Sequence, residues 1–340
     1  MSTPADQPPA PAAGAEPLVT VIMPGRDVAE YAAEALASLR AQTFTRWRAV
    51  LVDDASTDAT GEMFADAEAS DPRFHLVRLA RPRGLGAARN AGLDLVDTPY
   101  VGFLDADDVM TPTALERLVS SLSSSGSDVA VGAYVRLRPA TTPDGAVRPG
   151  EYTVGEVQPW VSASTDPARR ATTLAEHPDV SGNVVAWSKL SRVELWRRHA
   201  LRFPEGTLYE DQLIAQRLYV HARGIDVIPD VVVQWRERAD GSSLTQRKAA
   251  IAVLGDYLAG LRAGLAVLDA AGHRAAARAR VRLILEMDTP GLVRIAENHP
   301  DAAYRRLVGA FVRELAARAD LEALILDAET APLRSAAVLW

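Results

Sequence analysis

The segment Tyr100-Val101-Gly102-Phe103-Leu104-Asp105-Ala106-Asp107-Asp108 decides the expected fold, because a short apolar run stops at a cluster of carboxylates. Residues 100–104 have the length and composition of a buried strand. In an open α/β sheet, ligands bind at the carboxyl ends of the strands, which is where these acids follow. Clustered carboxylates at that place suit Mg²⁺ or Mn²⁺, which prefer oxygen ligands and leave positions for phosphates. The alternative is an acidic turn before a helix that starts at Thr111-Pro112.

Alternating strand and helix patterns surround this segment. Apolar runs predict strands and amphipathic spacing predicts helices, with Asp27 and Glu30 as a capping-box-like start of the first helix. Repeated strand–helix–strand units are typical of a mostly parallel, Rossmann-like sheet with helices on both faces. The expected strands cover residues 19–23, 48–52, 74–79 and 100–104, and the expected helices cover 28–42, 57–69 and 86–95.

The second half of the sequence is expected to complete this domain and then to change character. Residues 139–149 carry Thr, Pro, Asp and Gly and predict a loop, whereas residues 213–220 predict a helix. From Leu244 onward, Ala, Leu and Arg recur at helical spacing. We therefore expect a flexible lead, an α/β domain and a helical C-terminal region, over residues 1–17, 18–243 and 244–340 respectively.

The composition is that of a soluble globular protein, with 48% hydrophobic and 24% charged residues among 340. The net charge of −7 argues against nucleic-acid binding as the main function. Because the sequence lacks cysteine, a metal site must use carboxylate or histidine ligands, and the histidines show no ligand spacing. We find no signal-peptide pattern and no apolar run of membrane-spanning length, so we expect a cytoplasmic protein. Residues 273–282 are arginine-rich and predict a solvated helix face or, alternatively, a surface for an anionic polymer or membrane.

Two other strand ends carry polar motifs. Val52-Asp53-Asp54 ends the second expected strand, and Pro24-Gly25-Arg26-Asp27 ends the first. In a parallel sheet both motifs face the same crevice. A carboxylate such as Asp54 can accept a hydrogen bond from the N3–H of a uracil ring, while Ser56 or Thr57 is expected to cap the following helix.

Three more motifs follow along the chain. Gly84-Leu85-Gly86-Ala87-Ala88-Arg89-Asn90 opens an expected helix. Tyr209-Glu210-Asp211-Gln212 precedes another, where a carboxylate can take a proton from a hydroxyl or simply favour the helix dipole. Arg236 and Arg238 follow a late strand, and guanidinium groups are natural clamps for a diphosphate, although ordinary surface arginines are the alternative.

Together these motifs resemble the inverting family 2 glycosyltransferases with the GT-A fold. The resemblance spans roughly residues 18–240, and the segment from Lys189 to Gln212 is similar to the acceptor-side pattern of wall-teichoic-acid and capsule-type members. It implies that Asp54 binds the base, that Asp105 approaches the ribose and the metal, and that Asp107 coordinates the metal on the donor diphosphate.

The same resemblance implies roles on the acceptor side and around the donor. Asp211 corresponds to the general base, with Glu210 beside it in the catalytic motif. Arg89 is expected on the base or ribose side, and Arg238, with Arg236 as the second candidate, is expected to close over the donor.

One departure concerns the first motif. Most members have Pro-x-Tyr-Asn after the first strand, whereas this chain has Pro24-Gly25-Arg26-Asp27 and lacks the aromatic residue that commonly packs on the base. A planar guanidinium such as that of Arg26 can stack on a ring instead. We therefore place Pro24 and Arg26 among the expected donor-binding residues.

The implied activity is a metal-dependent transfer, with Mn²⁺ or Mg²⁺, of a sugar from a nucleotide diphosphate. The base-reading carboxylate points to a UDP-sugar, and the expected acceptor is a hydroxyl of a cell-envelope glycan, polyol-phosphate polymer or lipid-linked acceptor. A sugar nucleotidyltransferase and a non-catalytic nucleotide-sugar-binding module are the alternatives. Peripheral contact with the inner face of the membrane and a homo-oligomer through the C-terminal helices are further possible partnerships.

Overall fold

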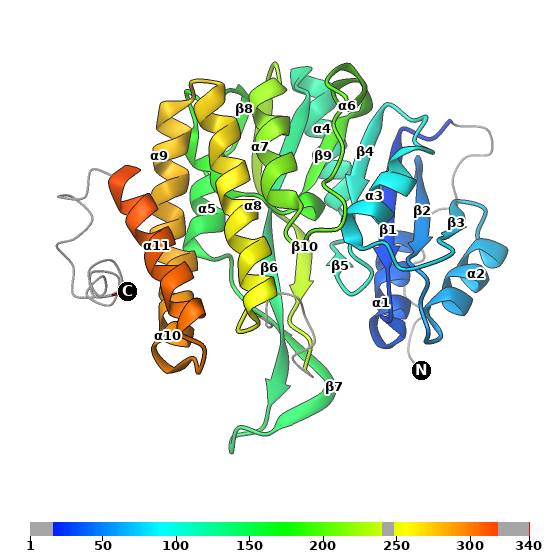
Figure 1. The fold of residues 1–340 in the computed structure, drawn as a ribbon. Helices are drawn as coiled ribbons and strands as arrows, with labels where there is room; N and C mark the ends of the chain where they lie inside the picture. The colour runs from blue at the N-terminus through cyan, green and yellow to red at the C-terminus, as the bar shows by residue number, and fades with distance from the viewer. Residues whose placement is uncertain (1–15, 240–247, 319–339) are drawn as a thin grey trace.

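The computed structural model describes residues 16–239, 248–318 and 340. Its described strands form one mixed sheet in the order β3-β2-β1-β4-β9-β6-β10-β5, with β7 paired to β6 and β8 to β10 (Figure 1). The strands are β1 (Val19–Gly25), β2 (Trp47–Asp53), β3 (Phe74–Arg78), β4 (Tyr100–Phe103), β5 (Val109–Met110), β6 (Val129–Thr141), β7 (Val147–Val154), β8 (Arg169–Thr172), β9 (Lys189–Arg192) and β10 (Ile225–Arg236).

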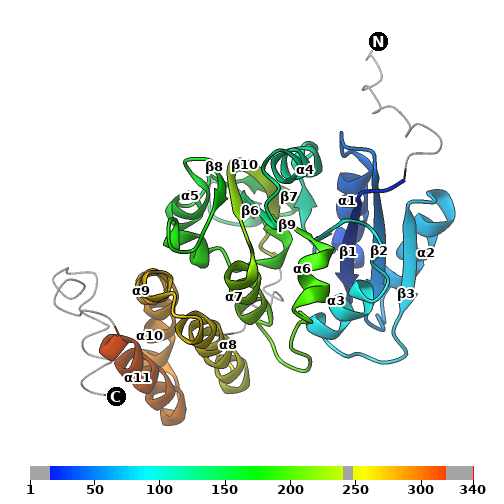
Figure 2. The same ribbon diagram turned by 90° about the horizontal axis from the view of Figure 1, so that it is seen from above.

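Helices cover both faces of this sheet (Figure 2). One core joins the sheet to α1, α2 and α4, and the other joins its opposite face to α3, α6 and α7. The helices of this part are α1 (Ala29–Arg40), α2 (Thr60–Ser70), α3 (Leu85–Leu93), α4 (Ala114–Ser125), α5 (Pro159–Thr165), α6 (Val193–Arg198) and α7 (Asp211–His221), with short 3₁₀ turns η1 (Pro178–Gly182) and η2 (Ala186–Ser188). The expected α/β sheet with flanking helices is confirmed.

The strands β1 to β4, between which helices alternate in the sequence, pair in parallel, and the rest of the sheet is mixed. β1 lies parallel to β2 and β4, and β2 lies parallel to β3. β9 then runs antiparallel between β4 and β6. The parallel strands are buried on both faces, which is why they read as continuous apolar runs in the sequence.

The stretch expected as a loop at residues 139–149 is mainly a β-hairpin, so that expectation was wrong. β6 continues to Thr141 and pairs with β7. The turn signals belong only to the tip, where the amide of Gly145 donates to the carbonyl of Thr142 at 2.8 Å and Gly145 has φ +88°. The hairpin extends away from the body of the protein (Figure 1).

The first helix is capped by another loop rather than by its own capping box. Asp27 has φ +50° and accepts from the amide of Thr57 at 2.7 Å. The amide of Ala29, in the first turn of α1, donates instead to Asp58 Oδ2 at 3.0 Å, and Asp58 lies in the loop after β2. Asp58 Oδ1 also accepts from the amide of Thr60 at 2.9 Å. The side chain that bonds the first amide of α2 is therefore that of Asp58, and not that of Ser56 or Thr57 as expected. These bonds tie the loops after β1 and β2 together.

The C-terminal region is helical, as expected, and packs on the α/β part. It consists of α8 (Ile251–Ala270), α9 (Arg274–Leu283), a π-helical turn η4 (Ile284–Asp288), α10 (Thr289–Asn298) and α11 (Ala302–Arg318), which share a third core. Of the described helices, α8 alone has the length and apolar composition to cross a membrane, and 44% of its apolar window is buried. The expectation that no segment has this character was therefore wrong for α8.

The arginine-rich helix α9 is only partly solvated. Arg274 and Arg278 are exposed, as expected for a solvated face. Arg280 is 5% exposed and its Nη2 donates to Gln212 Oε1 at 3.0 Å, so it faces the protein interior next to α7. This arginine connects the C-terminal helices to the start of α7.

We predict opposite effects for two Gly→Ala changes in α8. A Cβ at Gly264 would lie 2.9 Å from the carbonyl oxygen of Gln212, so Gly264→Ala should destabilise the protein by about 1–3 kcal/mol. Gly255 lies in the same helix with no atom within 4 Å of the added Cβ, so Gly255→Ala should stabilise it by about 0.4–1 kcal/mol. Urea unfolding measures both; equal free-energy changes would contradict the tight α7–α8 contact.

Candidate active site

The carboxyl ends of three parallel strands meet at one edge of the sheet. The amide of Asp54, after β2, donates to the carbonyl of Gly25 at 3.0 Å, and the amide of Ala106, after β4, donates to the carbonyl of Pro24 at 3.2 Å. Pro24 itself is buried within β1. The motifs at residues 24–27, 53–58 and 104–108 therefore lie side by side, as the parallel sheet predicted.

Arg89 links this edge to the start of α7. It is 2% exposed; its Nη2 donates to Asp105 Oδ1 at 2.6 Å and its Nη1 donates to Glu210 Oε1. Burial raises the carboxyl pKa of Glu210 and the guanidinium of Arg89 lowers it. Burial is the larger effect, and the pKa rises to about 7. Two acidic motifs that are far apart in the sequence thus share one buried cation.

The end of β10 brings two arginines to the acidic loop after β4. Arg238 Nε donates to Asp107 Oδ2 at 2.9 Å, and Arg236 Nε donates to the carbonyl of Asp107 at 2.7 Å. The amide of Arg236 also donates to Asp108 Oδ1 at 2.8 Å, while its guanidinium pairs with Glu34. Both arginines proposed from the sequence therefore lie at the expected metal loop.

The buried acids of this loop repel one another. Burial, together with the charges of Asp107 and Asp105, raises the pKa of Asp108 well above its ordinary value. Burial also raises the pKa of Asp107 against the opposing pull of Arg238. Asp108 Oδ2 is buried and makes no hydrogen bond. The ionised forms of Asp107 and Asp108 are therefore disfavoured despite the neighbouring arginines.

This donor set fits a divalent cation. Mg²⁺ is commonly held by one or two carboxylates together with phosphate oxygens and water, so Asp105 and Asp107 would suffice. Within the described ranges, no three His, Asp or Glu side chains gather around a common point as metal ligands. A cation here would therefore complete its coordination with groups of the substrate.

Asp211 begins α7 beside the buried Arg89–Glu210 pair. As a residue Asp211 is partly exposed, whereas Glu210 is 4% exposed. Burial raises the pKa of Asp211, and Arg89 and Lys189 oppose this effect. Tyr209, two residues earlier, has φ +59°, a backbone conformation that is costly for a non-glycine residue and is found preferentially at functional sites.

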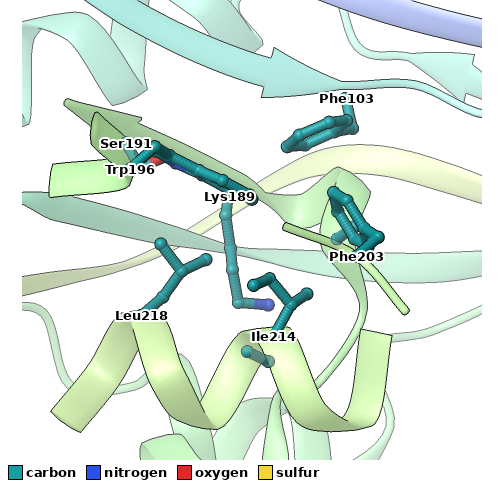
Figure 3. Close-up of a pocket in the computed structure, with 9 residues that line it drawn as sticks. Phe103, Lys189, Ser191, Trp196, Phe203, Ile214 and Leu218 are labelled. Atoms are coloured by element: carbon teal, nitrogen blue, oxygen red, sulfur yellow. The ribbon is translucent and has the colours of Figure 1, made fainter. Parts of the chain in front are cut away.

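Lys189 is a buried cation on the interior side of Asp211. Its Nζ donates to Asn183 Oδ1 at 2.7 Å, and burial lowers its pKa to about 7. The side chain lies between β9 and α7, near a cavity of about 10 Å³ lined by Phe103 and Phe203 among others (Figure 3). A volume of that size holds at most about one water molecule, so the cavity is a packing gap and not a sugar pocket.

The two residues expected at the nucleotide base differ in exposure. Asp54 is 4% exposed, and its two oxygens accept from the amides of Arg83 at 2.7 Å and Gly84 at 2.8 Å. Arg26 is exposed and its Nε lies 3.6 Å from Asp27 Oδ2. Their backbones are adjacent through Gly25, but no bond joins Arg26 to the Arg89 or Arg238 clusters among the described contacts.

Two aromatic residues were missed by the sequence reasoning. The ring of Tyr152, on β7, lies 4.3 Å from the guanidinium carbon of Arg236, and the ring of Tyr31, on α1, lies 5.3 Å from it. The Tyr31 ring also lies 5.6 Å from the guanidinium carbon of Arg238. No local motif marks them, because the contacts depend on the hairpin and on α1 packing beside the end of β10.

Comparisons with known proteins agree with this fold. Residues 20–182 match the model of glycosyl transferase family 2. The chain is 30% identical over 204 residues to the glycosyltransferase GlyA of Streptococcus pneumoniae serotype 4, covering 59% of this chain and 28% of that protein. It is 36% identical over 102 residues to the putative teichuronic acid biosynthesis glycosyltransferase TuaG of Bacillus subtilis, covering 30% of this chain and 40% of that protein. The match thus spans less than half the length of each relative.

Solved structures share the fold over almost the whole chain. TarS of S. aureus, residues 1–349 in complex with UDP-GlcNAc, has a TM-score of 0.69 at 20% identity and covers 94% of this chain and 86% of that one. The mannosyltransferase PcManGT from Pyrobaculum calidifontis, in complex with GDP-Man and Mn²⁺, has a TM-score of 0.56 at 19% identity. The match covers 99% of this chain and 90% of that one. The fold is therefore that of the GT-A glycosyltransferases. Residues 20–182 therefore form a glycosyltransferase family 2 domain.

Proposed function

We propose that this protein is a metal-dependent, inverting glycosyltransferase that transfers a sugar from a UDP-sugar to a hydroxyl of a cell-envelope acceptor. The observation that carries the proposal is the junction of the acidic loop after β4 with the Glu210-Asp211 motif through Arg89. In that junction, Asp105 of the acidic loop and Glu210 of the second motif bond to different amino groups of one buried guanidinium. An inverting transfer needs a cation-binding loop and a carboxylate base around the sugar C1.

Asp105 and Asp107 are the proposed ligands of Mn²⁺ or Mg²⁺. When bound, the cation stabilises the negative charge of the leaving diphosphate. Arg238 now neutralises Asp107, and a guanidinium can exchange one oxyanion for another, so it is the proposed clamp on the diphosphate. Arg236 is buried and anchored to the backbone of Asp107, which suits it to holding the loop in place.

Asp211 is the proposed general base. It accepts the proton of the acceptor hydroxyl as that oxygen attacks C1 from the face opposite the diphosphate, and the bond from C1 to the phosphate oxygen breaks. Glu210 is buried and already paired with Arg89. Its proposed role is therefore to hold Asp211 in place, and Asp211 alone takes the proton of the acceptor hydroxyl. The raised pKa of Asp211, caused first by burial, makes it a stronger base than an exposed aspartate.

Asp54, Arg26 and Pro24 are proposed to form the nucleoside side of the site. Asp54 would accept from uracil N3–H with the lone pairs that Arg83 and Gly84 leave free, and Arg26 would stack on the ring. The UDP-GlcNAc complex of TarS supports uridine, whereas the GDP-Man complex of PcManGT keeps guanosine as the second candidate.

The names of two relatives support the proposed acceptor class. TuaG is named for teichuronic acid biosynthesis, and an Escherichia coli relative, 30% identical over 117 residues, is named as a glucosyltransferase acting on a diphosphoundecaprenol-linked sugar. We propose a glycan, polyol-phosphate or lipid-linked acceptor, used in the cytoplasm or at the inner face of the membrane. The alternatives of a nucleotidyltransferase and a non-catalytic module predict no transfer from a nucleotide sugar.

Metal binding should depend on Asp107. Saturating Mn²⁺, at about a hundred times its Kd, is expected to stabilise the wild-type protein by about 2.7 kcal/mol, and Asp107→Asn should lose most of this gain because a direct ligand is removed. Calorimetric or fluorescence melting with and without Mn²⁺ measures it. Asp144→Asn, at the exposed hairpin tip, is the matched control and should keep the full stabilisation. An unchanged Mn²⁺ effect in Asp107→Asn would exclude that residue as a ligand.

Asp211→Asn should lower kcat by about 10²–10⁴ while leaving donor affinity nearly unchanged, because only proton transfer is lost. In the wild-type protein, the base must be deprotonated, so a raised pKa moves the loss of activity on acidification to higher pH than for an ordinary aspartate. Release of UDP from UDP-glucose or UDP-GlcNAc, followed against pH, checks both points. A collapse of donor binding with normal turnover would place Asp211 on the donor side instead.

UDP should bind more tightly than CDP when Mn²⁺ is present, and GDP and dTDP are measured beside them. The reason is the carboxylate of Asp54, which accepts from uracil N3–H but faces only an acceptor at cytosine N3. Asp54→Asn should weaken the binding of UDP by roughly tenfold to a hundredfold. This corresponds to the loss of one charge-assisted hydrogen bond, which contributes about 1.5–3 kcal/mol. Competition binding decides the matter, and a preference for GDP would refute the uridine assignment.

A further inference from the structure

The glycine-rich segment and α3 hold the acceptor-side segment 203–210 through close contacts. A Cβ at Gly86 would lie 2.1 Å from the carbonyl oxygen of Pro204, so only glycine lets the two backbones approach this closely. Asn90 Nδ2 donates to the carbonyl of Phe203 at 2.9 Å, and the amide of Phe203 donates back to Asn90 Oδ1 at 3.0 Å. The motif therefore binds a protein segment along most of its length.

Arg89 makes the strongest of these contacts. Its guanidinium and the side chain of Glu210 are 2% and 3% exposed, and its second amino group pairs with Asp105 at 2.6 Å. Removing one member of a buried ion pair leaves the other charge without compensation, so such pairs resist separation. The base-bearing segment is thus tied to the acidic donor loop through a single side chain.

The opposite side of the same segment is held by the C-terminal helices. Gly264 and Gly260 of α8 bring that helix close to the carbonyls of Gln212 and Tyr209. Arg280 of α9 donates to the side chain of Gln212 at 3.0 Å. Residues 209–212, which include Asp211, are therefore fixed between α3 on one side and α8 and α9 on the other.

We propose that Arg89 is a positioning residue that, with Glu210, fixes Asp211 relative to the donor loop and does not itself contact the nucleoside. The inference rests on the proposed function for its catalytic consequence, because it assigns Asp211 as the base. It replaces the sequence-based placement of Arg89 at the base or ribose. Arg89 has both amino groups committed to carboxylates, whereas Arg26 lies at the strand ends near Asp54.

Conservative variants separate positioning from donor contact. In Arg89→Lys and Glu210→Gln, kcat for release of UDP from UDP-glucose or UDP-GlcNAc with Mn²⁺ should fall by about tenfold or more, with KM and the calorimetric Kd of UDP within about threefold. Asp94→Asn is the matched control, because Asp94 of α3 pairs with Arg202 at an exposed position beside the same segment. It should leave all these constants unchanged.

Hydrogen–deuterium exchange of residues 205–212 supplies a readout that needs no turnover. Exchange should speed up about tenfold or more in Glu210→Gln and Arg89→Lys, and not in Asp94→Asn, if the buried pair fixes this segment. Unchanged exchange, or a UDP Kd weakened tenfold in Arg89→Lys with normal kcat, would overturn the inference. If the wild-type protein binds no UDP and releases none, the proposed donor fails, and the exchange data still decide the positioning role. Glu210→Gln keeps a hydrogen-bond acceptor for Arg89 and is the variant to use if Arg89→Lys does not fold.

Discussion

Buried negative charge at the carboxyl edge of the sheet is the constraint on which the site depends. Three parallel strands deliver carboxylates to that edge, and burial disfavours the ionised forms of Asp107 and Asp108. Arg89, Arg236 and Arg238 supply nearby cations from α3 and from the end of β10. Burial nevertheless keeps the carboxyl pKa values of Asp107 and Asp108 raised beside these arginines.

The same electrostatic balance joins the two halves of the site. Arg89 shares its charge between the donor loop and the Glu210-Asp211 motif, so that neither acidic group can move independently of the other. The C-terminal helices complete the arrangement, since α8 packs against the start of α7 at two glycines. The described helical residues 251–318 therefore support the start of α7, where the proposed base lies, and contribute no candidate catalytic side chain.

The sequence predicted much of this arrangement because local signals and strand ends agree. A parallel sheet puts Pro24, Asp54 and Asp105 at one edge whatever their distance along the chain, and the contacts at Gly25 and Pro24 confirm that they meet. The late arginines were found for the same reason, since Arg236 ends a strand. The predictions failed where a single local signal was used: the tip of a hairpin was taken for a whole loop, and Asp27 was taken for a helix cap.

The sequence by itself determined the order of strands and helices over residues 19–104, the glycosyltransferase motifs and the positions of the acidic residues. Periodicity and turn chemistry act within a few residues, so they are readable from one chain. Tertiary structure alone decided which charges pair: Arg89 with Glu210 over 121 residues of sequence, and Arg238 with Asp107 over 131. Such pairs depend on burial and on the approach of distant backbones, for which sequence spacing carries no signal.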